Sequence, residues 1–343
     1  MHQPPESKGK ISKLSLAGVS AAEWAKLAMI RDATQVDTNL DKFFILADKE
    51  PCEPHFTDHF TDEDQRAYHL FCKFPKQSKL SILQSTNGGP TLMSLSTAAQ
   101  LLFIPFLNAM IELLRGGIVP LNNQGILHRD IKPDNVVCSS TSGKYEIRLI
   151  DWDRAAKLDT ASITEISKKE QFVSSSNQPI AYAFISAAAK RITTATHNTV
   201  NLSTTLKTAV DERNHILLQN NAATYATGTK NVAVNVLPQI TAIVNKFYNA
   251  TKSFDWDEYA KLLIRNYDVY GWLSVINFCM QKQDTMFSDA SKYKYYVEPM
   301  KAFLCHYMYT PEVLAEPYNT AEMITRLNKI RESPLASTLL PEC

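Results

Sequence analysis

Two polar motifs, HRDIKPDN at 128–135 and LIDWD at 149–153, constrain this chain more than any other feature. They bring the carboxylates of Asp130 and Asp151 and the amide of Asn135 into one short stretch of sequence. Oxygen atoms of carboxylates and amides are the ligands that hard cations such as Mg²⁺ prefer. The sequence therefore predicts that these three side chains converge on one polar site.

The motifs resemble the catalytic loop and the downstream metal-binding Asp of protein kinases, and the Lys at position 132 is typical of the Ser/Thr branch. The resemblance implies that Asp130 accepts or orients the proton of the acceptor hydroxyl and that Lys132 neutralises charge on the transferring phosphoryl group. It also implies that Asn135 and Asp151 hold Mg²⁺ on bound ATP. The alternative, an ordinary polar turn between a helix and a strand, requires such an extended match to arise by chance.

Three further residues have supporting roles that the same resemblance implies. His128 packs under the catalytic loop, and Arg129 is available to a phosphorylated or acidic group of the activation segment. The segment NYDVYGWLSVINFCM at 266–280 resembles the buried helix of the kinase C-lobe. Its Asp268 is then the residue that holds the backbone of the HRD turn.

The implied fold is α+β and bilobal, with a small, divergent or incomplete β-rich N-lobe and hinge at 1–90 and a large, mainly helical C-lobe at 91–343. Short apolar runs bounded by Pro, Gly and polar residues predict strands, and helix-forming composition predicts helices. The predicted elements are a helix at 20–30 capped by Ser20, strands at 43–46, 68–74 and 79–83, a turn at 87–90, a core helix at 97–114 that Gly116-Gly117 ends or breaks, and strands at 136–138 and 148–150.

A long insertion interrupts the resemblance. Asp268 follows Asp151 by 117 positions, where the family has a few dozen. We therefore expect an insertion at about 159–255 in the activation-segment region, with several helices and a surface that could bind another protein. TPEVL at 310–314 resembles the end of an activation segment, but too little chain follows it. We therefore align this stretch with the end of the C-lobe, where Glu316 takes the place of an Arg of the family. That Arg normally pairs with a buried Glu that ends the activation segment, and this Glu is also missing upstream of Asp268.

The family's Asp-Phe-Gly is replaced here by Asp151-Trp152-Asp153. Asp153 thus stands where glycine gives the backbone more freedom. Its carboxylate could supplement metal coordination, or could raise the pKa of its neighbour by like-charge repulsion. Similar IDWD endings occur in kinase-like small-molecule phosphotransferases, so the change does not by itself imply inactivity.

The nucleotide-covering half of a kinase site is harder to find in the sequence. No GxGxxG loop occurs among the ten glycines. Lys8, Lys10 and Lys13 all precede the predicted helix that bears Glu23, and we select Lys10 and Glu23 as the ion pair that would hold the nucleotide. The absence of a phosphate-covering loop favours a weak or inactive pseudokinase as the alternative to an active kinase.

Composition indicates a soluble, cytoplasmic protein, or one of the host cytoplasm or virion if the chain is viral. The net charge of +1 gives no argument for nucleic acid or membrane partners. The apolar stretch at 98–114 is too short and too polar to span a bilayer. The six cysteines lack paired spacing and fit reduced thiols. Cys52, His55 and His59 have zinc-like spacing, but without a further ligand a polar loop is the better interpretation.

Three functions follow from these observations. The first is Mg²⁺-dependent transfer of the ATP γ-phosphate to Ser or Thr of a protein substrate, by a divergent kinase similar to those of large DNA viruses. The second is a catalytically weak or inactive pseudokinase that acts as a binding or structural component of a larger assembly. The third is a small-molecule phosphotransferase, which IDWD favours and KPDN opposes.

Overall fold

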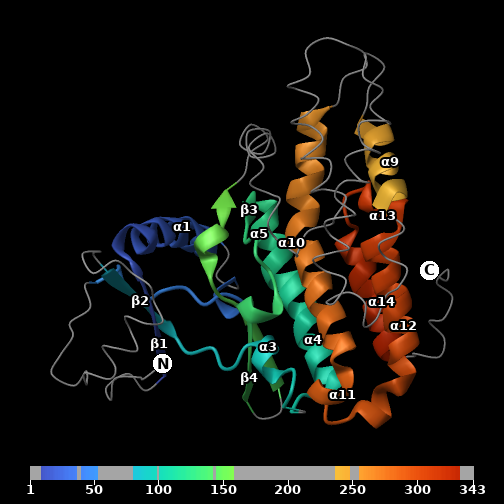
Figure 1. Cartoon of the computed structure of the whole chain (residues 1–343), viewed down its shortest axis with the longest axis horizontal. Helices are drawn as coiled ribbons and strands as arrows, with labels where there is room; N and C mark the ends of the chain where they lie inside the picture. The colour runs from blue at the N-terminus through green and yellow to red at the C-terminus, as the bar shows by residue number, and fades with distance from the viewer. Residues whose placement is uncertain are drawn as a thin grey trace, which may run out of the picture.

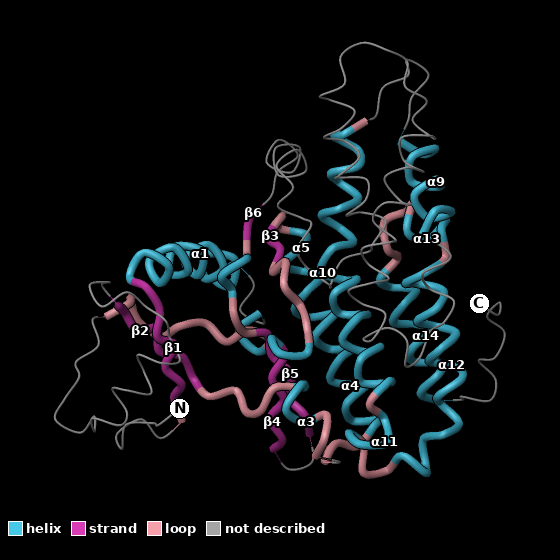
Figure 2. The backbone as a smooth tube through the Cα atoms, in the orientation of Figure 1, coloured by secondary structure: helices cyan, strands magenta, loops and turns pink. Residues whose placement is uncertain are grey.

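The computed structural model describes residues 9–36, 40–52, 80–98, 100–141, 144–157, 236–247 and 255–332. These residues form a mostly helical molecule with three two-stranded sheets, which agrees with an α+β class. The N-terminal elements lie on one side, the C-terminal helices lie on the other, and short strands lie between them (Figure 1). Figure 2 shows that helix dominates the C-terminal side.

The N-terminal part is built from one long helix and one antiparallel pair of strands. Strand β1 (Lys10–Leu16) leads directly into helix α1 (Ala17–Val36), and it pairs with β2 (Leu80–Thr86). The predicted helix and the predicted strand at 79–83 are both present. However, α1 begins three residues before Ser20, so the predicted capping role of Ser20 is wrong. Its buried hydroxyl forms a hydrogen bond with that of Ser15 instead.

The described residues 40–52 that follow α1 are mainly irregular and form bridges to both β2 and β5 (Lys144–Leu149). They contain a 3-10 turn, η1 (Leu40–Lys42), followed by a single parallel bridge to the next sheet. In that bridge Ile45 donates its N–H to Leu149, 2.9 Å, and Leu149 donates to Phe43, 2.8 Å. The strand predicted at 43–46 is therefore reduced to a bridge. Among the described residues, the N-terminal sheet has two strands, and the strand predicted at 68–74 lies outside them.

The predicted turn at 87–90 connects β2 to the short helix α3 (Leu92–Leu95) and lies against β4 (Val136–Thr141). Pro90 accepts a hydrogen bond from the N–H of Cys138, 2.9 Å. A Cβ on Gly89 would lie 2.7 Å from the carbonyl oxygen of the same cysteine, and Gly89 has φ +94°. Glycine is therefore required here both for its backbone conformation and for this close approach.

The predicted core helix is present but begins later than expected. Helix α4 (Phe103–Leu113) continues through a π-helical turn, η2 (Leu114–Ile118), into α5 (Val119–Asn123). The N–H of Phe103 is bound by the carboxylate of Asp289, 3.1 Å, a cap from far along the chain. The two glycines of η2 therefore do not end the helix but let the ring of Phe43 pack closely against it.

Both sequence motifs lie between short antiparallel strands. The strands and turns that hold them are β3 (Ile126–Leu127), which pairs with β6 (Ala156–Lys157), β4, which pairs with β5 (Lys144–Leu149), and the 3-10 turns η3 (Pro133–Asn135) and η4 (Trp152–Arg154). The strands predicted at 136–138 and 148–150 thus correspond to β4 and β5. The HRD motif follows β3, and the LIDWD motif begins at the end of β5.

The C-terminal part is a group of helices around one buried helix. They are α9 (Val236–Phe247), α10 (Trp256–Gln281), α11 (Gln283–Met286), α12 (Ala290–Tyr309), α13 (Pro311–Leu314) and α14 (Thr320–Glu332). Helix α10 runs beside α4 (Figure 1), and Trp272 donates its indole N–H to the carbonyl of Met110, 2.9 Å. This confirms that the segment at 266–280 is a buried helix. Of the expected insertion at 159–255, the described residues contain α9.

The cysteines differ in state. Cys52, Cys138 and Cys279 are free thiols, and Cys305 on α12 is disulfide-bonded. The expectation of reduced thiols is therefore wrong for Cys305, because spacing in sequence does not show which cysteines approach in space. The zinc alternative at Cys52, His55 and His59 lies mainly outside the described residues.

One helical stretch, Phe103–Asn123, is long and apolar enough to cross a membrane by length and composition alone. Half of its apolar window is buried inside the molecule, and Phe103, Phe106 and Leu107 are core residues. The same test is passed by core helices of soluble proteins, so this stretch is weak evidence for a membrane span.

Candidate functional site

The HRD turn is held in place by the buried carboxylate of Asp268. Its Oδ2 accepts the N–H of His128, 2.7 Å, and its Oδ1 accepts the N–H of Arg129, 2.9 Å. Arg129 has φ 64°, a left-handed conformation that costs energy for a residue with a side chain. The two bonds stabilise this turn, and they confirm the predicted contact. Burial raises the pKa of Asp268, although His128 and the two N–H donors oppose the shift.

His128 connects the HRD turn to the second motif. It is completely buried, its Nε2 bonds to the carbonyl of Ile150 at 2.9 Å, and its Nδ1 accepts the N–H of Asp130 at 3.3 Å. These partners assign the ring proton to Nε2. Burial lowers the pKa of His128, so the ring is neutral at physiological pH. Its predicted packing under the loop is therefore confirmed.

Asp130, Lys132 and Asn135 form one hydrogen-bonded group. Asp130 is buried, and its Oδ2 accepts bonds from the Lys132 ammonium, 2.6 Å, and from the Asn135 amide, 3.0 Å. Asn135 also donates to the backbone carbonyl of Asp130, 2.9 Å. Because its nitrogen is used in this way, the amide oxygen of Asn135 is left as the atom that could bind a metal.

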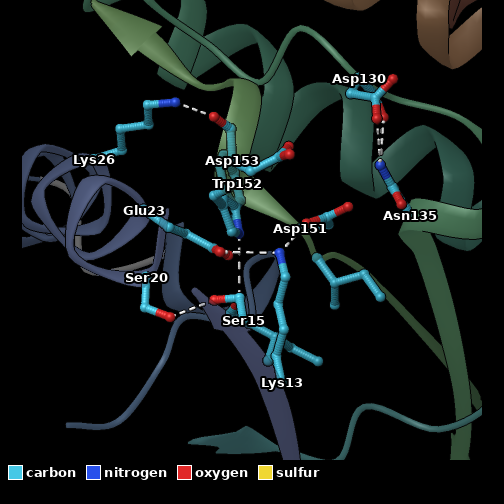
Figure 3. Close-up of polar contacts among 12 residues, drawn as sticks. Lys13, Ser15, Ser20, Glu23, Lys26, Asp130, Asn135, Asp151, Trp152 and Asp153 are labelled. Carbon is cyan, nitrogen blue, oxygen red and sulfur yellow. Dashed lines mark hydrogen bonds and ion pairs between the residues drawn. The ribbon is translucent and has the colours of Figure 1, made fainter. Parts of the chain in front are cut away.

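Asp151 faces the N-terminal part of the molecule. It has φ 66° and ψ 73°, so the chain turns sharply where β5 ends and η4 begins. Its carboxylate contacts the ammonium of Lys13 on β1, 2.6 Å, and the same ammonium contacts Glu23 on α1, 2.9 Å (Figure 3). Lys13 thus joins the second motif to both N-terminal elements.

This arrangement corrects the predicted Lys10–Glu23 pair. Glu23 is part of an ion pair as expected, but its partner is Lys13, whereas Lys10 pairs with Asp48, 2.9 Å. The reason is the alternation of side chains along a strand, which puts residues an odd number of positions apart on opposite faces. Burial is the largest influence on Glu23 and raises its pKa, against the opposing effect of Lys13.

Asp153 brings a third carboxylate to the site. One oxygen atom from each of Asp130, Asp151 and Asp153 lies within 4.8 Å of the others. Two oxygens that share one Mg²⁺ are at most about 4.2 Å apart, twice the metal–oxygen distance. The three carboxylates are therefore nearly close enough to share an ion, which fits the donor chemistry of Mg²⁺. Burial and then the charge of Asp151 raise the pKa of Asp153.

Trp152 fixes the segment that carries these carboxylates. Its indole is buried, donates to the carbonyl of Ile45, 3.1 Å, and packs edge-on against Phe44 with ring centroids 5.0 Å apart. The centroid of the His128 ring lies 4.4 Å from that of Trp152. Lys26 of α1 adds a bond to the carbonyl of Asp153 (Figure 3). Each of these contacts limits the movement of the residues between Ile150 and Ala155.

Basic side chains also border the acidic centre. The Nη1 atom of Arg154 lies 3.9 Å from Asp130, opposite the contact made by Lys132. Both cations are partly exposed, and Asp130 itself is not. The site can therefore place positive charge beside an anionic group that approaches Asp130.

The sequence identified most of these residues but missed Lys13 as the ion-pair partner and Arg154 as a neighbour of Asp130. No local sequence signal separates Lys13 from Lys10, because the choice depends on which face of β1 meets α1. No family model and no curated protein matches this chain.

Proposed function

We propose that this protein has a bilobal, protein-kinase-like fold and transfers the γ-phosphate of ATP to Ser or Thr of a protein substrate. The observation that carries the proposal is that Lys13, Glu23 and Asp151 form one charged group, and that a carboxylate oxygen of Asp151 lies within 4.8 Å of one of Asp130. Phosphoryl transfer depends on positioning and on charge stabilisation, which these groups and Lys132 can supply.

Each residue of the site has a defined role in this proposal. Asp130 accepts the proton of the acceptor hydroxyl, and Lys132 stabilises negative charge on the transferring group. Asp151, Asn135 and Asp153 offer the oxygen ligands for Mg²⁺. Lys13, oriented by Glu23, binds phosphate oxygens. When bound, ATP would supply the phosphoryl group, and Mg²⁺ would offset the negative charge of that group.

The order of elements supports the same proposal. A lysine-bearing strand, a glutamate-bearing helix, a further strand and the connection at 87–90 precede the long helix and the HRD turn. This is the order that the resemblance implies for an N-lobe, a hinge and a C-lobe. We place the boundary between the lobes near residue 90 for this reason.

The proposal is tested with purified protein, labelled ATP, Mg²⁺ and dephosphorylated casein as a generic acceptor. Asp130→Asn and Asp151→Asn should each reduce incorporation by about a hundredfold or more, since loss of a general base or a metal ligand has effects of this size. Asp134→Asn is the matched control, because Asp134 is an exposed carboxylate of the same loop. Unchanged incorporation in both site variants would contradict the proposal.

A second candidate function is that of a pseudokinase, which acts as a binding or structural component of a larger assembly, with or without bound nucleotide, and does not catalyse phosphate transfer. Two observations favour it: Asp151 and Asp130 already pair with lysines at 2.6 Å, and the sequence has no GxGxxG loop. A thermal-shift titration with ATP and Mg²⁺ distinguishes the candidates, because a ligand that binds the folded state must raise the melting temperature. A shift without incorporation indicates a pseudokinase, and no shift indicates a structural component.

A further inference from the structure

A polar cavity lies in the helical part of the molecule, apart from the carboxylate site. Its volume is about 490 Å³, within the range of ligand pockets. It is bordered by the end of α5, the N-terminal half of α10 and the chain that leads into α14. Lys261 and Arg265 line it, and no acidic side chain does. The charge of this cavity is thus opposite to that of the cluster formed by Asp130, Asp151 and Asp153.

The two cations are placed for a shared ligand. Lys261 and Arg265 are four residues apart on α10, so they lie on one face of the helix. Lys261 pairs with Glu258, 2.5 Å, but both side chains are more than half exposed, and such pairs are weak. Arg265 is exposed and forms no hydrogen bond or ion pair with the described residues. Both groups are therefore available to an anion.

The wall opposite α10 is held rigidly. Asn266 is fully buried, donates to the carbonyl of Glu316, 2.8 Å, and accepts the N–H of Tyr318, 2.9 Å. The Tyr318 hydroxyl in turn donates to the carbonyl of Tyr307, 2.9 Å. Thr320, the first residue of α14, also lines the cavity, which adds the partial positive charge of a helix N-terminus. The cavity is therefore largely preformed.

We propose that this cavity binds a phosphomonoester group carried on a polypeptide, with Arg265 and Lys261 pairing its oxygens. A phosphorylated side chain carries nearly two negative charges and three acceptor oxygens, which suit two cations better than a single carboxylate does. The planar guanidinium can bind two of those oxygens at once. The cavity is larger than one phosphate group. Its apolar wall, which consists of Val119, Ile264, Val269 and Pro317, offers space to an apolar side chain of the polypeptide beside the phosphorylated residue.

The cavity also adjoins the support of the HRD turn. With its amide nitrogen turned toward its acceptors, Asn122 donates to Asp268 Oδ2, 3.1 Å, and to the carbonyl of Ile126, 3.1 Å. Asn122 lines the cavity, and Asp268 holds the backbone of His128 and Arg129. A bound phosphopeptide would therefore lie one residue away from the group that fixes the catalytic turn.

Calorimetric titration of the full chain tests the proposal with the peptide Ala-Leu-Ala-phosphoSer-Leu-Ala. We expect saturable binding, at least tenfold weaker binding of the unphosphorylated peptide, and at least a tenfold loss of affinity in the double variant Lys261→Gln/Arg265→Gln. The matched control is Lys301→Gln, because Lys301 forms the same i,i+3 pair with Glu298 on the exposed face of α12. It should bind the phosphopeptide as the wild type does.

Further titrations distinguish this site from the carboxylate site, and distinguish a phosphopeptide from a simple anion as its ligand. Asp130→Asn/Asp151→Asn should leave phosphopeptide binding unchanged, so failure of the proposed transfer activity would not affect this result. Equal affinity for inorganic phosphate and for the phosphopeptide would contradict a polypeptide ligand. Unchanged binding in Lys261→Gln/Arg265→Gln, or equal binding of both peptides, would overturn the proposal.

Discussion

Lys13 is the single residue on which the nucleotide side of the proposed site depends. Burial lowers its pKa, but hydrogen bonds and charges from Asp151 and Glu23 outweigh this effect, so its pKa is raised. The ammonium is therefore charged at neutral pH. Its side chain is still 43% exposed, which leaves it accessible to a phosphate group.

Exchange of Lys13 should weaken nucleotide binding, and exchange of Lys10 should not. In Lys13→Met the site loses its cation between two carboxylates, so we expect at least a tenfold loss of ATP–Mg²⁺ affinity. Lys10→Met removes a partly exposed ion pair with Asp48, and pairs of this kind contribute little. Thermal-shift titration measures both. An equal loss of affinity in the two variants would contradict a specific role of Lys13 in nucleotide binding.

The contacts of the HRDIKPDN motif could be predicted from the sequence, because most are local and the others depend on one distant carboxylate, that of Asp268. Asn135 and Lys132 reach Asp130 within a single turn, so sequence spacing determines their approach. The partner of Glu23 was not predictable in the same way. It depends on where β1 ends and α1 begins, and no capping residue marks that boundary.

The connection between β2 and α3 depends on a close approach of two backbone segments, so a side chain that prevents this approach should reduce stability. Gly89→Ala should lower the free energy of unfolding by about 1–3 kcal/mol, because alanine is strained at positive φ and its Cβ would contact the Cys138 carbonyl. Gly18→Ala on α1 is the control, since a Cβ there meets open space. It should change stability by at most about 1 kcal/mol, in the stabilising direction. Urea unfolding measures both.

Element boundaries were predicted less well than element types. The core helix was expected from 97, but the chain before Phe103 is held extended by a bridge from Leu101 to Phe287. Its cap is the side chain of Asp289, nearly two hundred residues later. Likewise, the glycines of η2 do not end the helix, and the ring of Phe43 packs closely against them. Such tertiary contacts override local sequence signals, so they could not be derived from the sequence alone.

At the scale of the whole molecule, a few buried side chains connect the N-terminal part, the motifs and the helices. Trp152 bonds to Ile45 and packs on His128, and Asp268 of α10 binds the backbone of the same turn. The candidate site therefore forms only when three distant parts of the chain are folded together. This explains why the sequence could predict the site's chemistry but not its complete geometry.

Asp268 should make stability depend on pH in a defined direction. Burial raises its pKa in the folded state, so the folded protein keeps this proton at pH values where the unfolded chain has released it. Stability from this group is therefore highest at or below its ordinary pKa of 3.8 and falls as pH rises toward the folded-state value. Asp268→Asn cannot ionise, so it lacks this contribution.

We expect the stability advantage of the wild type over Asp268→Asn to become smaller as pH rises from about 4 to about 7, the range above an ordinary carboxyl pKa. The variant should be less stable throughout, since an amide offers one acceptor oxygen to the two N–H groups of His128 and Arg129. Urea unfolding of both proteins across this range gives the difference directly, and groups common to both largely cancel. If the advantage instead grows with pH, the pKa of Asp268 is lowered in the folded state, and its two hydrogen bonds outweigh its burial.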